Sequence, residues 1–182
     1  MKQGIFTLLA LLCISASAQM SRPYKAAFFM AAGPAKFGTG DNAGFSLRNE
    51  LCLRPLSWLG VMAGTSVSHA QGGRSVIENG LNGGELQLRL QLPSLPNDLY
   101  IGAGPAFARS SNTYVLTEIS QGNTVLRELE QVQEWTYGLS LGAGYAFRFY
   151  SRYLLGGGVW INSFRNGDIA SGITLRFGIA LE

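Results

Sequence analysis

The segment ELQLRLQL at residues 85–92 alternates strictly between polar side chains and leucine. Successive side chains of an extended strand point to opposite faces, so this segment has one polar face and one face made only of leucine. The same alternation recurs in FSLRNELCLR at residues 45–54 and in ITLRFGIAL at residues 173–181. These three segments predict β-strands in a sheet with one polar and one apolar face.

The alternation extends in both directions from these segments and predicts eight strands. They lie at residues 24–33, 44–54, 58–69, 84–93, 99–110, 133–148, 153–164 and 171–181. After residue 19, no window has the spacing of an amphipathic helix. Most of the predicted strands have ten to twelve residues, and a tilted strand needs about 9–11 residues to cross a bilayer. Their length therefore favours strands that span a membrane.

Short and long connections alternate along the predicted chain. The short ones are 55–57, 94–98 and 149–152, and the longer ones are 34–43, 70–83, 111–132 and 165–170. This layout is typical of outer-membrane barrels, which have tight periplasmic turns and longer outer loops. The predicted fold class is therefore all-β: an eight-stranded antiparallel up-and-down transmembrane β-barrel with both of its ends on the periplasmic side.

The composition supports an exported membrane protein. Charged residues make up 14% of the 182 residues and hydrophobic residues 47%, whereas soluble domains have about 25% charged residues. A net charge of +3 gives no indication of nucleic-acid binding. Residues 1–18 have a basic start, a short apolar stretch and small residues before Gln19, as a cleaved signal peptide has. We therefore predict a signal peptide at 1–18, a barrel domain at 19–182 and a location in the outer membrane.

Aromatic residues gather at both ends of the predicted strands. Next to the short turns lie Tyr24, Trp58, Tyr100, Phe147, Phe149, Tyr150 and Tyr153, and nearer the long connections lie Phe45, Phe107, Trp135 and Tyr137. Two aromatic belts are what the two interfaces of a membrane select. A soluble eight-stranded cup would instead expose rows of glycine and alanine to water, such as Gly102, Gly104, Ala106 and Ala108. Such rows suit a crowded barrel interior better.

Two segments share the frame L-x-[I/L]-G-A-G-x-A-F: LYIGAGPAFAR at 99–109 and LSLGAGYAFRF at 139–149. A dinucleotide-binding fingerprint would need a third small residue at position 107 and a helix after it. Phe107 stands there and the alternation continues. We therefore interpret both segments as strands with inward glycines. Pro105 lacks a backbone donor and is expected near the outer rim or at a bulge.

Long polar side chains on the second and fourth strands are expected to reach across the barrel to this glycine wall. The polar network predicted in the lumen consists of Arg48, Glu50, Glu85, Arg89, Glu134, Arg148 and Arg176. Eight strands enclose a space that side chains can fill, and buried charges must pair. The prediction is a plugged, salt-bridged lumen whose slight positive excess water or an anion could balance. A narrow transport or ligand-binding barrel is the alternative.

Residues with the potential for catalysis or metal binding are few. Removal of the signal peptide leaves one cysteine, Cys52, and His69 is the only histidine, so no disulfide, metal site or cofactor site is predicted. A lipid-modifying enzyme could use His69 with a serine near the outer rim. Ser68 and His69 are neighbours on a strand and point to opposite faces, which prevents direct pairing. A serine from another strand, such as Ser110 or Ser111, is an alternative partner without further support in the sequence. We therefore predict no catalytic site and no enzyme.

The signal peptide, the eight alternating strands, the repeated GAGxAF, the GGGVW at 156–160 and the close GITLRFGIALE together resemble a known architecture. They are similar to the outer-membrane β-barrel (porin-like) families of Bacteroidota, of OmpA/OmpX type. The resemblance implies a monomer with a structural or surface-interaction role, surrounded by outer-membrane lipid. It also implies contact with other envelope proteins through the outer loops, or an accessory place in a secretion or conjugative-transfer apparatus.

Overall fold

The computed structural model describes residues 24–38, 42–71, 76–92, 98–121, 124–149 and 152–181. Its strands are β1 (Ala26–Phe37), β2 (Asn42–Leu56), β3 (Leu59–Gln71), β4 (Val76–Gln91), β5 (Asp98–Gln121), β6 (Thr124–Arg148), β7 (Tyr153–Phe164) and β8 (Ile169–Leu181). The signal peptide proposed for residues 1–18 lies outside the described residues.

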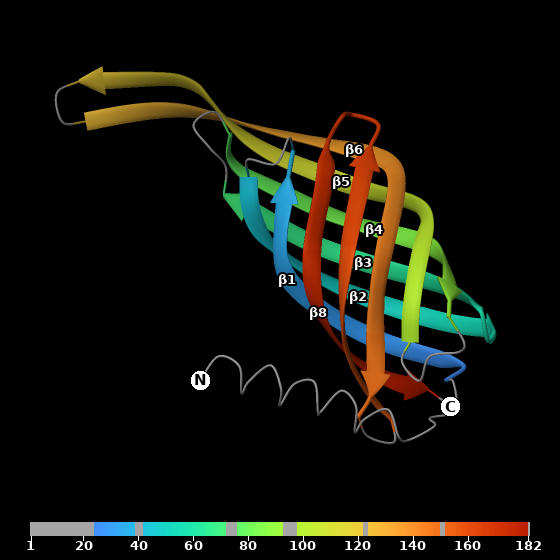
Figure 1. The fold of residues 1–182 in the computed structure, drawn as a ribbon. Coiled ribbons are helices and arrows are strands. Elements are labelled where there is room, and N and C mark those ends of the chain that lie inside the picture. Colours follow the sequence, from blue (N-terminus) through green and yellow to red (C-terminus); the bar gives the residue numbers. More distant parts are fainter. Residues whose placement is uncertain are drawn as a thin grey trace, which may run out of the picture.

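The eight strands form one closed barrel in sequence order (Figure 1). Each strand pairs antiparallel with the next, and the ring closes where β1 pairs with β8, for example Phe28 with Ile179. The predicted fold class is confirmed. No helix among the described residues is long and apolar enough to cross a membrane.

The barrel is apolar on its outside and polar on its inside. Leu88, Ile101 and Leu175 are 62%, 64% and 68% exposed. Their chain neighbours Gln87 and Arg176 are buried inside the ring. A soluble cup would bury the leucine rows, so this orientation rules out the soluble alternative and matches the lipid-facing band of membrane barrels.

The strands extend further on one side than the sequence predicted. Residues 111–132 were expected to be a loop, but they continue β5 and β6 as a hairpin whose pairing runs to Gln121 and Thr124. The segments 34–43 and 70–83 also lie largely within strands. Connections are therefore short at both ends of the barrel, and the predicted alternation of short and long loops is wrong. Figure 1 shows the hairpin projecting well beyond the ring.

Two of the three prolines in the described strands, Pro34 and Pro105, lie where one ladder is interrupted. Pro105 was predicted near the outer rim or at a bulge, and this prediction is wrong. It lies within β5, where it pairs with Leu139 of β6, and the ladder from β5 to β4 skips it. Pro34 pairs with Phe45 of β2, and the ladder from β1 to β8 skips it. Because proline has no N–H, each residue fits where a hydrogen bond is needed on one side only.

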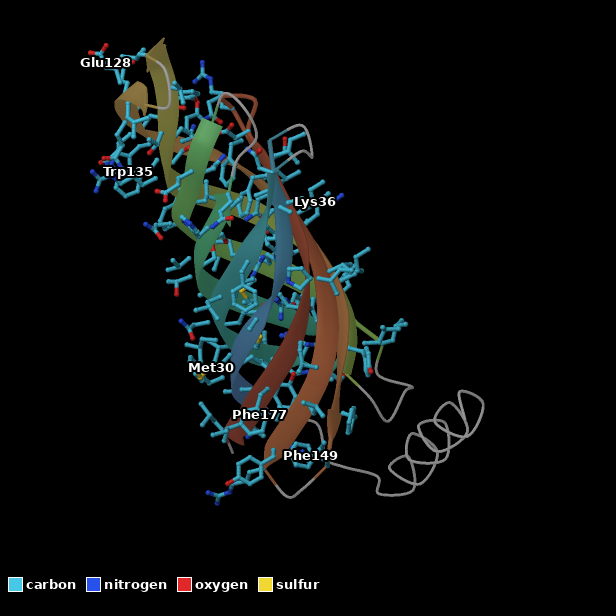
Figure 2. The ribbon with its side chains drawn as sticks, turned by 90° about the vertical axis from the view of Figure 1, so that its left-hand side faces the viewer. Met30, Lys36, Glu128, Trp135, Phe149 and Phe177 are labelled. Carbon is cyan, nitrogen blue, oxygen red and sulfur yellow. The ribbon has the colours of Figure 1, made fainter. Side chains whose placement is uncertain are left out.

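The residues of the predicted outer aromatic belt all point outward, and the predicted inner belt needs correction. Phe45 and Phe107 are exposed on the outside of the barrel, and Trp135 and Tyr137 are exposed on β6 before its ladder to β7 begins. At the opposite end Trp58, Phe149 and Tyr153 are exposed, but Tyr24 and Tyr100 are each only 6% exposed, inside the barrel. Figure 2 shows Phe149 and Phe177 together at that end, far from Glu128 on the hairpin. Tyr150 lies outside the described residues.

Candidate functional site

The polar interior is built from alternating positions of three strands. β2 supplies Arg48 and Glu50, β4 supplies Glu85 and Arg89, and β8 supplies Arg176, and all five side chains are buried. Small residues separate them around the ring. Ala31 pairs with Arg48 on one side and Arg176 on the other, and Gly64 lies between Glu50 and Glu85. Because these neighbours are small, the long side chains have room to extend across the lumen.

Two carboxylates connect the three guanidinium groups. Glu50 Oε2 accepts hydrogen bonds from Arg89 Nη2 at 2.8 Å and from Arg176 Nη2 at 2.6 Å. Arg48 Nη2 donates to Glu85 Oε1, and Arg48 Nε lies 3.9 Å from Glu50 Oε1, which joins the two groups. The five residues therefore form one ion-pair cluster across the barrel, in which each buried charge has an opposite neighbour, as burial requires.

Neutral residues complete the cluster on the side of β6. Ser140 Oγ donates to Glu85 Oε2 at 2.5 Å, and Gln87 Nε2 donates to Ser140 Oγ at 2.7 Å. On the opposite side Arg89 Nη1 lies 3.1 Å from Cys52 Sγ. Gln87, Ser140 and Cys52 were not assigned to the predicted network, although all three occupy inward positions of the alternation.

Aromatic rings cover the guanidinium groups. Arg89 Cζ lies 4.0 Å from the ring centre of Tyr100, Arg176 Cζ 4.2 Å from that of Phe29, and Arg48 Cζ 4.5 Å from that of Trp160. These are cation–π contacts. A Cβ on Gly102 would lie 2.8 Å from Arg89 Cγ. The expected packing of long side chains against a glycine wall is therefore present, with the rings of Tyr100 and Trp160 as further partners.

Two of the seven predicted network residues lie outside the cluster. Glu134 is exposed at the outer rim, where its Oε1 accepts from Asn166 Nδ2 at 2.6 Å. It precedes Gly138, the residue at which the β6–β7 ladder begins, so the ring does not enclose it. Arg148 is half-buried at the opposite end of β6. Their assignment to the interior network is wrong because both lie at the ends of the barrel.

Among the described residues, little free space lies beside the ion-pair cluster. A cavity of about 10 Å³ is lined by Arg48, Gln87, Arg89 and Trp160, together with Glu50, Tyr100, Gly142, Gly158, Val159 and Thr174. About this volume is needed for a single water molecule. A larger hollow, of about 800 Å³, lies against outward apolar residues such as Leu88, Ile101 and Leu141. The larger hollow therefore opens toward the lipid side.

The rim residues considered for catalysis are not brought together. Ser68 is buried and donates to Ser46 Oγ at 2.8 Å, whereas His69 is exposed on the other face of β3. Among the described residues, no group of three or more His, Cys, Asp or Glu side chains could hold a metal ion. The geometry offers no pairing between this serine and this histidine.

The projecting hairpin is the second candidate site. β5 pairs with β4 only as far as Tyr114, and the β6–β7 ladder begins at Gly138. Beyond these residues β5 and β6 form a two-stranded ribbon. Its described side chains from Glu128 to Trp135 are all exposed. Figure 2 shows Glu128 and Trp135 at the far end of the molecule from Phe149.

Comparison with known proteins adds structural neighbours only, since neither a family model nor a curated protein matches the sequence. Neisserial surface protein A (NspA) has a TM-score of 0.61 at 14% identity, over 86% of this chain and 97% of that chain. The outer membrane protein OprG from Pseudomonas aeruginosa has a TM-score of 0.58 at 11% identity, over 90% and 99%. Ail, the attachment invasion locus protein of Yersinia pestis, has a TM-score of 0.56 at 9% identity, over 88% and 100%. The fold of this chain is therefore that of eight-stranded outer-membrane β-barrels.

Proposed function

We propose that the protein is an integral outer-membrane barrel with a structural or surface-interaction role, a plugged interior and no enzymatic activity. In this proposal residues 1–18 are a signal peptide that export removes, and residues 19–182 remain as a monomeric barrel in the outer membrane. The β5–β6 hairpin is the part that meets other proteins of the envelope or the cell exterior.

The outer surface supports a place in the membrane. Its outward rows are apolar over β1, β2, β4 and β8, with exposed residues such as Met30, Leu47, Leu88 and Leu175. Aromatic residues border this band at both ends. An exposed apolar surface of this extent would make a soluble monomer aggregate, whereas lipid covers it without penalty.

The interior supports a plugged barrel. The ion-pair cluster joins β2, β4 and β8 across the full width of the barrel. The cavity beside it, of about 10 Å³, is too small for a solute larger than a single water molecule. Passage would require buried ion pairs to separate, which is strongly unfavourable.

The observation that carries the surface role is the length of the hairpin. Residues 115–121 of β5 and 124–137 of β6 continue past the ladders to β4 and β7. Their outer edges thus carry backbone groups that can pair with another strand, and exposed edges of this kind are used for strand addition by partners. Ail is named for attachment and has the same fold, which agrees with a surface role.

The orientation of the hairpin can be tested by thiol labelling. In Glu130→Cys the new thiol lies on the exposed hairpin, and in Ser57→Cys it lies on the exposed β2–β3 turn at the opposite end. The native Cys52 is buried and serves as the background. We expect a membrane-impermeant maleimide to label Glu130→Cys on intact cells and Ser57→Cys only after the outer membrane is permeabilised. The reverse pattern would contradict the proposal.

The interaction itself can be tested with a photo-crosslinking amino acid at Leu129 on the hairpin. The matched control is the same amino acid at Ile101, which is also exposed and apolar but lies on the lipid-facing wall. We expect a discrete protein adduct from position 129 on intact cells and none from position 101. Equal crosslinking from the two positions, or none from position 129, would argue against a surface-interaction role.

A further inference from the structure

Two arginines on the outward face of the barrel lie at the edge of its apolar band. Arg109 of β5 and Arg165, the residue after β7, are both exposed. On the outward row of β5, Arg109 follows Phe107, an exposed apolar residue. Because lipid covers the apolar band in the proposed membrane location, the two guanidinium groups lie at the level of the lipid headgroups.

Trp135 and Tyr137 of β6 lie between the two arginines. Arg109 is paired with Trp135, two residues before Tyr137, at the end of the barrel opposite Phe149 (Figure 2). On the other side of β6, Arg165 N donates to the Tyr137 carbonyl oxygen at 2.9 Å, and Arg165 Cζ lies 5.6 Å from the Tyr137 ring centre. Two strand spacings of about 4.8 Å each and this two-residue offset separate the two arginine backbones. Both long side chains can therefore reach the same lipid headgroup.

Neither arginine is neutralised by a carboxylate. Arg109 Nη2 donates to the Gln133 side-chain oxygen, and Arg165 Nη1 donates to the Tyr137 hydroxyl. No ion pair of the described residues includes either arginine. A guanidinium group has five N–H donors, so each arginine keeps donors for a further acceptor.

The carboxylates near the two arginines are held by another residue or lie farther away. Glu134 Oε1 and Asp168 Oδ2 both accept from Asn166 Nδ2, at 2.6 and 2.8 Å. On β4, exposed Glu78 pairs with β5 four residues beyond Arg109, or roughly 13 Å along the strand. The outward face beside Trp135 and Tyr137 therefore has an excess of positive charge.

The apolar hollow of about 800 Å³ lies on the same three strands. Its lining includes, on β5, β6 and β7 in turn, Ile101 and Ala103, Leu141 and Ala143, and Val159 and Ile161. Along β6, Leu141 is four residues from Tyr137, or roughly 13 Å. One leaflet has about 15 Å of hydrocarbon. A lipid with its headgroup at the arginines can therefore place an acyl chain in the hollow.

We propose that Arg109 and Arg165 bind the phosphate of a lipid in the leaflet around this end of the barrel, with one acyl chain in the hollow. Guanidinium groups bind phosphate through two parallel N–H···O bonds. A phosphate monoester carries about −1.5 to −2 charges at pH 7, which matches two arginines. Trp135 and Tyr137 are the aromatic residues that a headgroup region favours. This inference rests on the proposed membrane location and is independent of the interaction role of the hairpin.

Native mass spectrometry of the protein in detergent tests the site. The probes are dioleoyl phosphatidic acid, a phosphate monoester, and dioleoyl phosphatidylcholine, which is zwitterionic. We expect one phosphatidic acid molecule per barrel, bound about tenfold more tightly than phosphatidylcholine, since each arginine near a headgroup attracts anionic lipid. Equal binding of the two lipids would overturn the proposal.

The double variant Arg109→Gln/Arg165→Gln should bind the two lipids within about twofold of each other, because it loses both charges. The matched control is Arg152→Gln, the same substitution at an exposed position at the opposite end of the barrel. The control should keep the full preference for phosphatidic acid. A preference that survives in the double variant would assign the lipid to another part of the surface.

Glycerol 3-phosphate separates a lipid site from a site for a free phosphate compound, because it carries the same phosphate without acyl chains. An excess of it should leave the bound phosphatidic acid in place. Displacement of the lipid would overturn the lipid assignment.

The hollow is tested by Ala143→Leu, which adds a larger side chain to its lining. This variant should bind phosphatidic acid several-fold more weakly. Ala32→Leu, on the outward row of β1 and outside the hollow, should bind it as the unaltered protein does. Equal binding by the two variants would contradict the placement of the acyl chain.

Insertion into phosphatidylcholine vesicles separates this proposal from the membrane location on which it rests. All of these variants change outward side chains, so each should insert as the unaltered protein does. Failure of the unaltered protein to insert would contradict the membrane location. Insertion without a preference for phosphatidic acid would contradict the lipid site alone.

Discussion

Glu50 is the residue on which the interior cluster depends most. Its Oε2 accepts from two arginines that come from different strands, β4 and β8. Glu50 lies on β2, so these hydrogen bonds connect β2 to β4 and to β8, the strand that closes the barrel. The alternation of the sequence identified all five members of the cluster as inward, because position parity alone decides which face a residue takes.

Replacing Glu50 by glutamine should strongly destabilise the protein. The amide removes one of the two buried negative charges and leaves Arg89 and Arg176 without their shared carboxylate, which costs about 3–5 kcal/mol in buried pairs. The free energy of unfolding can be measured by urea titration in lipid vesicles. Glu128→Gln, on the exposed hairpin, is the control and should change it by less than about 0.5 kcal/mol. Equal stability of the two variants would show that the cluster does not stabilise the barrel.

Gly104, in the segment 99–109, is needed for close approach of two backbones. A Cβ there would lie 1.9 Å from the carbonyl oxygen of Leu86 on β4. Because that neighbour is backbone, the strands must move apart, and Gly104→Ala should lower the free energy of unfolding by about 1–3 kcal/mol. At Gly157 the nearest atom would be 3.6 Å away, so Gly157→Ala should be nearly neutral. If both variants unfold alike, the glycine wall has no packing role.

Not every side chain in the interior could be assigned from sequence. Tyr100 was placed in the aromatic belt because it begins a strand, yet it covers Arg89 inside the barrel. An aromatic side chain near a strand end can lie either at the membrane interface or in the lumen of the barrel. Only the register with the neighbouring strands determines which of the two it takes. Glu134 was placed inside for its parity, but the ring ends before it.

At the scale of the elements, the strand count, order and direction could be predicted, and the hairpin could not. Within the membrane band one face meets lipid and the other the lumen, which enforces alternation. Beyond the ring both faces of β5 and β6 meet water, so no pattern is enforced and residues 111–132 look like a loop. One local signal was present: Gly122-Asn123 lies between two β-prone stretches, and such a dipeptide favours a hairpin.

The hairpin should be dispensable for the barrel. Replacing residues 116–128 by Asn-Gly joins Val115 to Leu129, which are already paired, through a two-residue turn. All residues that β4 and β7 pair with remain, so we expect an unchanged unfolding midpoint in urea. The crosslinks from position 129, which this variant retains, should disappear, because the part of the hairpin beyond it is removed. Loss of folding would mean that the hairpin is part of the barrel's own stability.

At the scale of the whole molecule, the outer surface and the closed ring predict behaviour on gels. Barrels of this kind resist unfolding by dodecyl sulfate at room temperature, since the closed ring leaves no open edge. We expect unheated and boiled samples to migrate differently, and the protein to stay in the membrane fraction after carbonate extraction. A single heat-insensitive band that carbonate releases would exclude a membrane barrel.

The lumen of the barrel is filled by the side chains of the protein itself. The most direct test of this plugged lumen is to insert the purified protein into planar lipid bilayers and record the ionic current under an applied voltage. The ion-pair cluster across β2, β4 and β8 predicts a silent baseline. Steady unitary current steps, reproduced at each insertion, would contradict the plugged interior and favour a narrow transport barrel.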